Sequence, residues 1–284
     1  MRTRIEQQTF DEERALYHAE HTDLSFVTFA GPADGESALK EAHDVTLENC
    51  AFSLRYPLWH TTDFKLNRCT MDESTRAAIW YAKNGEIRNS TLGGIKAVRA
   101  CDNICFAGCK IVSPEFGWKS QNLTLSDTVL TAEYPFLDSR DLLLNNVELH
   151  GKYSFQYTEN VKIENCNLDT KDAFWHSKNV TVTDSVLKGE YLGWYAENLT
   201  LIRCKIIGTQ PLCYCENLCL VDCEMIDCDL AFEYSDVTAE IRGGIDSVKN
   251  PKSGRITADE IGEIIKENPV IPCSAAIVER RKKQ

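Results

Sequence analysis

Two carboxylates, a lysine and a histidine stand where they could do acid–base chemistry. The spacing of the chain predicts that Asp138 and Glu115 lie one repeat apart, with Lys119 and His176 close by. Carboxylates paired across a cleft can supply the acid and the base of glycoside cleavage. The same grouping also arises by chance on a charged surface. Catalysis by Asp138, Glu115, Lys119 or His176 is therefore a hypothesis, and whether the chain is an enzyme stays open.

Aromatic side chains recur at two neighbouring positions, every nineteen residues. All five tryptophans, such as Trp175 and Trp194, occupy the first position, and the more polar second position is expected to face outward because successive strand residues point to opposite faces. An outer row of rings flanked by charged loops suits a sugar chain or small sugar. The candidate ligand-binding residues are His60, Tyr81, Arg76, Arg99, Lys96, Trp118, Tyr157, Lys152, Trp175, Glu190, Trp194, Tyr195, Tyr214 and Glu233.

Two further interpretations of these aromatic residues stay open. Tryptophan can fill the core while tyrosine only covers a sheet. The chain could also be a non-catalytic scaffold whose sheet face binds a protein partner or a second copy of itself as a homo-oligomer. A sugar site predicts a cleft with carboxylates near exposed rings, whereas an interaction surface predicts a flat apolar face.

The thirteen cysteines do not predict a metal site. No Cys-x-x-Cys occurs, so the usual zinc spacing is missing. Six of these thiols instead occupy one small, inward position of the repeat, and stacked pairs such as Cys50 with Cys69 and Cys204 with Cys223 are close enough to oxidise. No glycine-rich phosphate loop occurs either, and we expect neither a metal nor a cofactor.

The element that positions these residues is an internal repeat. Eleven segments begin with Asn or Asp, followed by an apolar residue, any residue and a second apolar residue. Nine of the ten steps between them are nineteen residues, and the step from Asp63 to Asn84 is twenty-one. The starting residues are Asp44, Asp63, Asn84, Asn103, Asn122, Asp141, Asn160, Asn179, Asn198, Asn217 and Asp236.

The repeat predicts an all-β fold, a single-stranded parallel β-helix of about eleven coils. Apolar residues one, three and eight positions after each start alternate with polar ones, as in strands with one face in the core. A helical solenoid would need a period near 3.6 over longer segments. The Asn and Asp side chains of the start position favour left-handed turns and are expected to hydrogen-bond from coil to coil.

The whole chain, residues 1–284, is predicted to form one domain. Residues 23–245 carry the coils, because the apolar pattern repeats there, and residues 1–22 are expected to form an N-terminal cap. Residues 246–284 interrupt the register with prolines and are expected to form a C-terminal cap and tail. Within them, residues 257–265 fit a helix with a capping box or a strand equally well.

Composition limits the partners. The formal net charge is −12, which disfavours nucleic acid and anionic membranes. No stretch of eighteen apolar residues occurs, and the N-terminal residues lack the apolar region of a signal peptide. The expected location is the cytoplasm.

The segments SPEFGWK, GKYSFQYTEN, DTKDAFWHSKN and GEYLGWYAEN resemble an uncharacterised bacterial family of right-handed parallel β-helix proteins in the pectin-lyase-like superfold. The resemblance covers roughly residues 5–265. It implies a right-handed coil and no particular activity. The Asn-Thr-Asp, Asp-Asp, Gly-His-Gly and Arg-Ile-Lys motifs of polygalacturonase-like enzymes are absent, as is the calcium and arginine set of pectate lyases. Sugar chemistry is thus implied only by analogy of fold.

Overall fold

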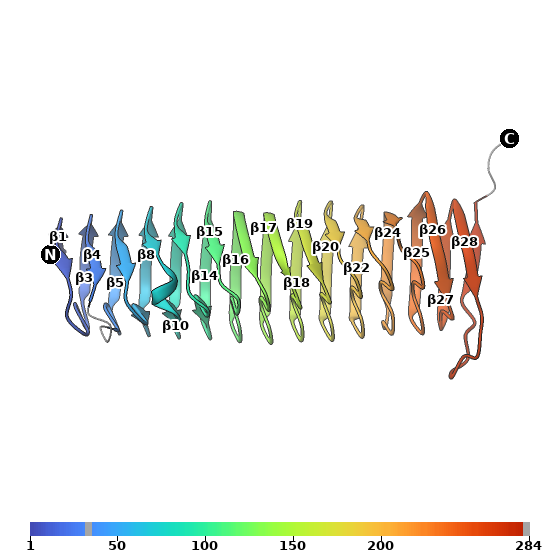
Figure 1. Ribbon diagram of the computed structural model, residues 1–284, viewed down its shortest axis with the longest axis horizontal. Coiled ribbons are helices and arrows are strands. Elements are labelled where there is room, and N and C mark those ends of the chain that lie inside the picture. Colours follow the sequence, from blue (N-terminus) through green and yellow to red (C-terminus); the bar gives the residue numbers. More distant parts are fainter. Residues whose placement is uncertain (32–35, 281–284) are drawn as a thin grey trace. The chain divides into compact units, whose positions relative to one another are not determined.

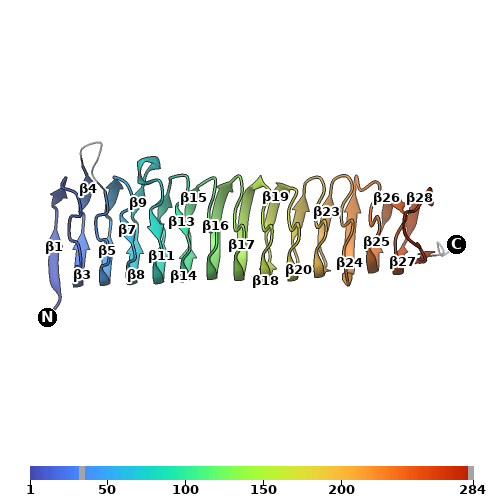
Figure 2. The ribbon, with the colours of Figure 1, turned by 90° about the horizontal axis from the view of Figure 1, so that it is seen from below.

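The computed structural model describes residues 1–31 and 36–280. They form two compact units, Met1–Leu143 (unit 1) and Leu144–Gln284 (unit 2). In each unit, short parallel strands stack coil upon coil (Figures 1 and 2). The predicted all-β parallel β-solenoid is confirmed, but the two units together contain about 14 turns rather than eleven.

The additional turns come from both ends of the chain. Residues 1–22, expected as a cap, already supply strands that pair in parallel with the next coil, for example Thr3 with Thr22. Residues 253–265 are strands and contain no helix, which decides between the two predicted conformations. Changed spacings, with Thr22 opposite Val45 near the N-terminus and Asp236 opposite Ser253 near the C-terminus, hide these coils from a nineteen-residue pattern. Residues 281–284 of the predicted tail lie outside the described residues.

Unit 1 contains three stacks of strands. The first is β1, β3, β5, β8, β11, β14 and β16, the second is β2, β4, β6, β9, β12, β15 and the end of β16, and the third is β7, β10 and β13. The bounds are β1 Thr3–Glu6, β2 Thr9–Phe10, β3 Glu20–Ser25, β4 Thr28–Ala30, β5 His43–Glu48, β6 Ala51–Ser53, β7 Leu58–Trp59, β8 Thr62–Asn67, β9 Thr70–Met71, β10 Ile79–Trp80, β11 Lys83–Arg88, β12 Thr91–Leu92, β13 Val98–Arg99, β14 Asp102–Ala107, β15 Lys110–Val112 and β16 Gln121–Ala132.

The longer step of twenty-one residues has a structural cause. A short 3₁₀ helix, η1 (Glu73–Thr75), follows β9 and takes up the additional residues. The Asp72 carboxylate caps η1 by accepting a hydrogen bond from the Ser74 backbone N–H at 2.9 Å. The strands on either side therefore keep their pairing, with Thr91 opposite Thr70.

Unit 2 repeats this arrangement. β17 (Arg140–Lys152) begins in unit 1, and its residues from Leu144 onward belong to unit 2. One stack is β18, β20, β22, β24, β25, β27 and β29, another is the end of β17, β19, β21, β23 and the end of β24, and β26 pairs with β28. The bounds are β18 Glu159–Glu164, β19 Asn167–Lys171, β20 Lys178–Thr183, β21 Val186–Lys188, β22 Glu197–Ile202, β23 Lys205–Ile207, β24 Leu218–Ile226, β25 Asp236–Arg242, β26 Gly244–Lys249, β27 Ser253–Ala258, β28 Glu260–Ile265 and β29 Ala276–Glu279.

The core of each unit consists of columns of identical or similar side chains. In unit 1 the rings of Phe29 and Phe52 stack at 4.8 Å between centroids, and in unit 2 those of Phe155 and Phe174 stack at 5.0 Å. All four rings are at most 1% exposed. Because parallel strands bring equivalent residues into register, a side chain that fits one coil also fits the next.

The predicted polar ladder at the start position is confirmed. In unit 1 the Asn103 side-chain amide donates to Asn84 at 2.9 Å, and Asn84 donates to the Asp63 carboxylate at 3.0 Å. In unit 2 Asn217 donates to Asn198 at 2.8 Å, and Asn198 donates to Asn179 at 2.9 Å. These residues have φ near +55°, the left-handed conformation that Asn and Asp tolerate best.

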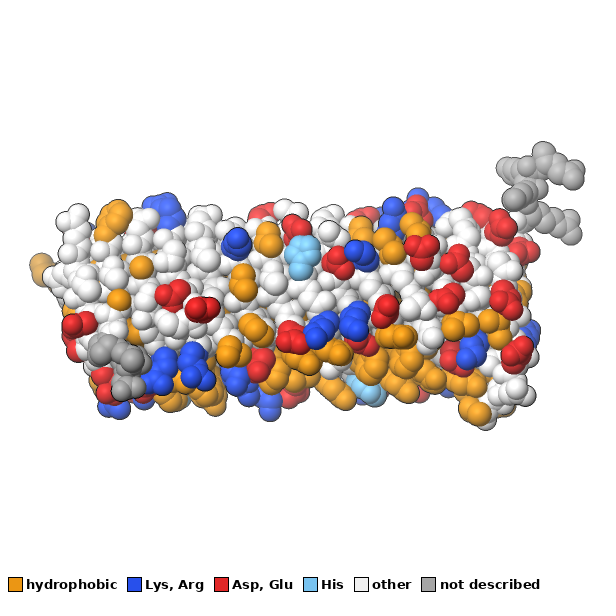
Figure 3. All heavy atoms as spheres, viewed as in Figure 1, with side chains coloured by type: hydrophobic (Ala, Val, Ile, Leu, Met, Phe, Trp, Pro, Cys, Tyr) orange, Lys and Arg blue, Asp and Glu red, His pale blue; other side chains and the backbone are white. Residues whose placement is uncertain are grey.

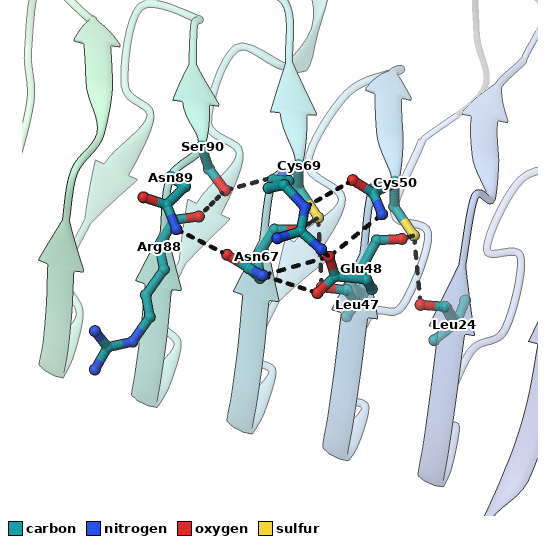
Figure 4. A network of polar contacts seen from close by, with 11 residues as sticks. Leu24, Leu47, Glu48, Cys50, Asn67, Cys69, Arg88, Asn89 and Ser90 are labelled. Atoms are coloured by element: carbon teal, nitrogen blue, oxygen red, sulfur yellow. Dashed lines mark hydrogen bonds and ion pairs between the residues drawn. The ribbon is translucent and has the colours of Figure 1, made fainter.

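The small inward column does more than fill space (Figure 4). The Cys50 thiol lies 3.8 Å from the Leu24 carbonyl and the Cys69 thiol 3.6 Å from the Leu47 carbonyl, each in the preceding coil. In the next coil the Ser90 hydroxyl accepts from the Cys69 backbone N–H at 3.0 Å. Cys, Ser and Thr thus share this column because each is small and can satisfy backbone groups at a turn. All thirteen cysteines are free thiols.

Candidate functional site

A row of aromatic rings follows the coils of unit 2, exposed at Tyr157, His176 and Tyr195 and half-buried at Tyr214. Tyr157 and His176 stack at 5.0 Å between ring centroids, His176 and Tyr195 at 4.9 Å, and Tyr195 and Tyr214 at 4.8 Å. We call these four residues the outer ladder. The planes of the first three rings are within 8° of parallel. Hydrophobic side chains, a class that includes tyrosine and tryptophan, gather along the lower edge of unit 2 in Figure 3.

The polar atoms of the outer ladder are unused. Within the part of the chain that the structure describes, no hydrogen bond joins the hydroxyls of Tyr157, Tyr195 and Tyr214 or the imidazole of His176 to another group. The faces of the rings cover one another, so their edges and polar atoms point toward solvent. The outer ladder therefore presents a row of rings with centroids about 5 Å apart, each of which carries a hydrogen-bonding group, on a rigid backbone.

Trp175 and Trp194 form a second, half-buried stack beside the outer ladder. Their rings lie 5.4 Å apart with 5° between the planes. The indole N–H of Trp175 donates to the Tyr191 carbonyl, and that of Trp194 donates to the Gln210 carbonyl, both at 2.8 Å. Each indole is thus fixed against the turn of the following coil. The nineteen-residue register that places equivalent tryptophans above one another is confirmed.

The prediction that the second, more polar column faces outward is confirmed at His176 and Tyr195, but the tryptophan column is not fully buried in return. The tryptophan column is half-buried at Trp175 and Trp194, and the next residues, His176 and Tyr195, are exposed. His176 and Tyr195 have φ of 54° and 59°. A left-handed residue interrupts the strict alternation of an extended strand, so neighbouring side chains can both reach the surface.

Asp172 occupies the turn that leads into this aromatic segment. The backbone pairing places it next to Tyr153 on one side and Tyr191 on the other, since Tyr153 N–H donates to the Lys171 carbonyl and Asp172 N–H to the Glu190 carbonyl. Asp172 is 7% exposed. No side-chain hydrogen bond or ion pair of Asp172 occurs with any described residue, and its oxygens are not completely sealed from solvent.

The surroundings of Asp172 favour its protonated form. Burial raises the pKa of this carboxyl above its ordinary value of 3.8; the ammonium of Lys171 acts in the opposite direction, and the carboxylate of Glu190 raises the pKa further. A carboxyl with these properties beside exposed rings is a candidate functional group. The sequence places Asp172 at a loop position that is elsewhere charged or aromatic, but it gives no sign that the side chain lacks a partner.

We expect Asp172→Asn to stabilise the protein at neutral pH. A carboxyl whose pKa is raised by folding contributes most at low pH, and its contribution falls as the pH rises from the unfolded value through the folded value. Asparagine has no charge to desolvate and tolerates the left-handed φ of 52°. Thermal unfolding should therefore give a higher Tm for the variant at pH 7, with the difference shrinking toward pH 4.

Glu164→Gln removes one negative charge from an exposed position of β18 and is the matched control. It should leave the Tm unchanged at both pH values. A Tm for Asp172→Asn below that of the unmodified protein at pH 7 would show that the carboxylate has a stabilising partner.

The remaining predicted residues of unit 2 are placed around the same segment. The Lys152 ammonium lies 5.4 Å from the centre of the Tyr153 ring. Glu190 is exposed, directly before Tyr191. Glu233 is half-buried and forms an ion pair with Lys249 at 3.0 Å. Glu233 is therefore neutralised, whereas Glu190 has no ion pair among the described residues.

Unit 1 carries a separate aromatic group. Trp59 and Trp80 stack at 5.5 Å, and the rings of His60 and Tyr81 lie 5.1 Å apart. The indole N–H groups of both tryptophans are buried and have no hydrogen-bond partner among the described residues. The Lys40 ammonium lies 4.4 Å above the Trp59 ring. None of the residues named in this group carries a carboxyl, which distinguishes it from the rings near Asp172.

Glu115 lies in unit 1 between two cations. Its carboxylate is 3.5 Å from the Lys96 ammonium and 3.5 Å from the Arg99 guanidinium. Arg99 also lies over the Trp118 ring at 5.2 Å. These residues, predicted as ligand contacts, thus form one charged and aromatic cluster. Arg76, the other predicted cation, is exposed at the end of η1.

The four residues of the catalytic hypothesis belong to different units. Lys119 and Asp138 are exposed in unit 1, on adjacent coils, because Lys119 N–H donates to the Leu137 carbonyl. His176 is part of the outer ladder in unit 2. A joint catalytic role for Asp138, Glu115, Lys119 and His176 stays a prediction.

Two hollows of the surface lie away from the aromatic rings. One, about 370 Å³, lies in unit 2 beside Asp184, Arg203, Glu224 and Arg242. Its charges are already paired; Arg203, for example, binds Asp184 through two hydrogen bonds of 2.7 and 2.6 Å. A second hollow of about 290 Å³ in unit 1 lies next to Gly85.

Among the residues that the structure describes, two kinds of feature are absent. No group of three or more His, Cys, Asp or Glu side chains is placed to hold a metal ion. No helix there has the length and apolar character needed to cross a membrane.

The solved structures that resemble this chain share little sequence identity with it. The A-module of mannuronan C-5 epimerase AlgE4 from Azotobacter vinelandii is 11% identical, with a TM-score of 0.37 over 84% of this chain and 89% of that one. The adhesin PfbA of Streptococcus pneumoniae is 8% identical, with a TM-score of 0.38 over 97% and 91%. The catalytic domain of a GH87 alpha-1,3-glucanase in complex with tetrasaccharides is 9% identical, with a TM-score of 0.40 over 99% and 64%.

At these identities and TM-scores, none of the three structures indicates what this chain binds. No curated protein matches the chain by sequence. A family described as "Protein of unknown function (DUF3737)" matches residues 3–278, nearly the whole chain. The predicted membership of an uncharacterised β-helix family is confirmed: the chain belongs to the DUF3737 family.

Proposed function

We propose that unit 2 binds an oligosaccharide along the outer ladder. The observation that supports this is the row of Tyr157, His176, Tyr195 and Tyr214, whose ring centroids are 4.8–5.0 Å apart and whose hydroxyl and imidazole groups are unused. A regular row of donors and acceptors suits a ligand that repeats regularly, and sugar hydroxyls are both donors and acceptors. The adjacent indoles of Trp175 and Trp194 add apolar area for the C–H faces of a sugar ring.

In this proposal the sugar contacts the edges of the rings rather than their faces. The stacked rings cover one another, so a sugar cannot lie flat on an internal ring of the ladder. It can, however, lie across the edges and exchange hydrogen bonds with the polar atoms. This arrangement predicts that the hydroxyls matter more than the aromatic surface.

The test removes the hydroxyls and keeps the rings. Purified protein is titrated calorimetrically with a panel of neutral oligosaccharides, and the tightest ligand is used with the triple variant Tyr157→Phe, Tyr195→Phe, Tyr214→Phe. At about 1 kcal/mol for each lost hydrogen bond, the triple variant should bind roughly 100-fold more weakly. Tyr81→Phe, which removes a hydroxyl from an exposed tyrosine of unit 1, should leave the affinity unchanged.

Two outcomes contradict the proposal: no oligosaccharide binds, or the triple variant binds as tightly as the unmodified protein. The alternative is a protein partner or a second copy on the same face, because Tyr157 and Tyr195 are 57% and 42% exposed. A stable oligomer that dissociates when Tyr195 is replaced by Glu would support that alternative.

A further inference from the structure

The turn beside the outer ladder contains a carboxyl group that lacks a counter-charge. Asp172 is 7% exposed and has neither a hydrogen bond nor an ion pair to its side chain among the described residues. Buried carboxylates are ordinarily paired, because an uncompensated charge is costly to remove from water. Since its oxygens keep some contact with solvent, a ligand group can reach them.

The equivalent turn position in unit 1 shows what such a carboxyl needs. Glu115 stands three repeats of nineteen residues before Asp172. Its carboxylate has two counter-charges, Lys96 and Arg99, each at 3.5 Å. Around Asp172 the nearest cation in sequence, Lys171, is exposed and forms no ion pair with it within 4.0 Å. Asp172 is thus the member of this column whose counter-charge is missing.

Aromatic rings surround the same turn. Tyr153 and Tyr191 flank Asp172 on the adjacent coils, and the Trp175 indole is fixed against the turn by its hydrogen bond to the Tyr191 carbonyl. A cation is attracted to the face of an aromatic ring as well as to a carboxylate. The Lys152 ammonium, 5.4 Å from the Tyr153 ring, shows that one of these rings already contacts a cation.

The charged neighbours of Asp172 have both signs, because the ammonium of Lys171 opposes the effect of Glu190 on this carboxyl. Glu190, exposed and without an ion pair, precedes Tyr191 directly and adds a second negative charge. An anionic ligand would be repelled by both carboxylates, and a neutral ligand would leave Asp172 uncompensated. A ligand with an ammonium group supplies the missing counter-charge.

We propose that the sugar bound by unit 2 is an amino sugar with a free ammonium group, which Asp172 recognises within the aromatic turn of Tyr153, Tyr191 and Trp175. This inference rests on the proposed function, because the ammonium group is carried by the oligosaccharide that lies along the outer ladder. It adds the chemical class of the ligand.

The experiment compares three oligosaccharides of equal length: glucosamine oligomers, N-acetylglucosamine oligomers and a neutral glucan. Calorimetric titrations are made below the pKa of the amine, so that the first ligand is positively charged. The unmodified protein should bind the glucosamine oligomer at least about tenfold more tightly than the N-acetylated one. Asp172→Asn should remove this preference and leave the affinity for the N-acetylated oligomer within about twofold.

Glu164→Gln is again the control, because it removes the same charge from an exposed position of β18. It should keep the preference for the glucosamine oligomer. Thermal unfolding of both variants, for which we expect no loss of stability, separates an effect on binding from an effect on folding.

The outcomes distinguish the two proposals. If neutral or N-acetylated oligomers bind and the glucosamine oligomer binds no more tightly, the assignment of an amino sugar is overturned and the oligosaccharide proposal stands. If the control variant loses the preference as fully as Asp172→Asn, the attraction comes from the net negative charge, and the role of Asp172 is overturned. If no oligomer binds at all, the proposed function itself fails.

Discussion

Phe174→Ala is expected to lower the free energy of unfolding by about 3–5 kcal/mol. The Phe174 ring is 1% exposed and stacks on Phe155 at 5.0 Å with 9° between the planes. Removing the ring leaves a cavity in the core of unit 2, and the coils above and below cannot close it because their backbones are fixed by strand pairing. Equilibrium unfolding in urea, followed by far-UV circular dichroism, measures the loss as a lower midpoint concentration.

Phe26→Ala is the matched control for Phe174→Ala. Phe26 is 60% exposed and, like Phe174, has a positive φ (54° against 63°). The two substitutions therefore make the same chemical change in the same backbone conformation and differ in burial. The control should change the free energy of unfolding by no more than about 0.5 kcal/mol. Equal losses in the two variants would contradict a packed interior at Phe174.

Gly254→Ala should be the other strongly destabilising substitution, with an expected loss of at least about 3 kcal/mol. Gly254 lies in β27 opposite Val237 and has a φ of +94°, which side chains other than glycine rarely adopt. A Cβ at this position would lie 2.0 Å from the Val237 carbonyl oxygen, so the two coils would have to separate. Urea unfolding measures this loss as well.

A substitution at Gly243 separates the effect of the positive φ from the effect of the steric clash at Gly254. Gly243 also has a positive φ, +78°, but a Cβ there would have no neighbour within 4 Å. Gly243→Ala thus introduces the backbone strain without the steric clash and should cost about 1 kcal/mol. A loss for Gly254→Ala as small as that for Gly243→Ala would mean that the backbone at β27 yields to the side chain.

The repeat predicts the fold because strand stacking makes the period visible in the sequence. Val180 and Val182 are buried and their register partners Leu199 and Leu201 follow nineteen residues later, as the pattern requires. The chain ends were missed because their coils keep the strand but change the spacing. Asp236 and its partner Ser253 are seventeen residues apart, and the start position of this coil holds a serine instead of Asn or Asp.

The candidate site was predicted only in part. The stacking of Trp175 on Trp194 follows from the period alone. The exposure of His176 was predicted as well, but the partial exposure of Trp175 beside it was not, because it depends on a left-handed residue inside a segment that reads as a strand. The Asp172 carboxyl lacks a partner among the described residues because of where several long side chains point. The spacing of residues in the sequence gives no information about those directions.

The asparagine column gives each unit a direction. Asp63, when ionised, can only accept hydrogen bonds, so Asn84 must turn its NH₂ group toward Asp63 and its oxygen toward Asn103. All the side-chain amides then point the same way along the axis, so their dipoles add. Within a run of asparagines an aspartate could not donate, so one of its oxygens would face the oxygen of the neighbouring side chain. Spontaneous deamidation of Asn84 or Asn198 would create that arrangement, so chemical ageing is expected to weaken the column at these two positions.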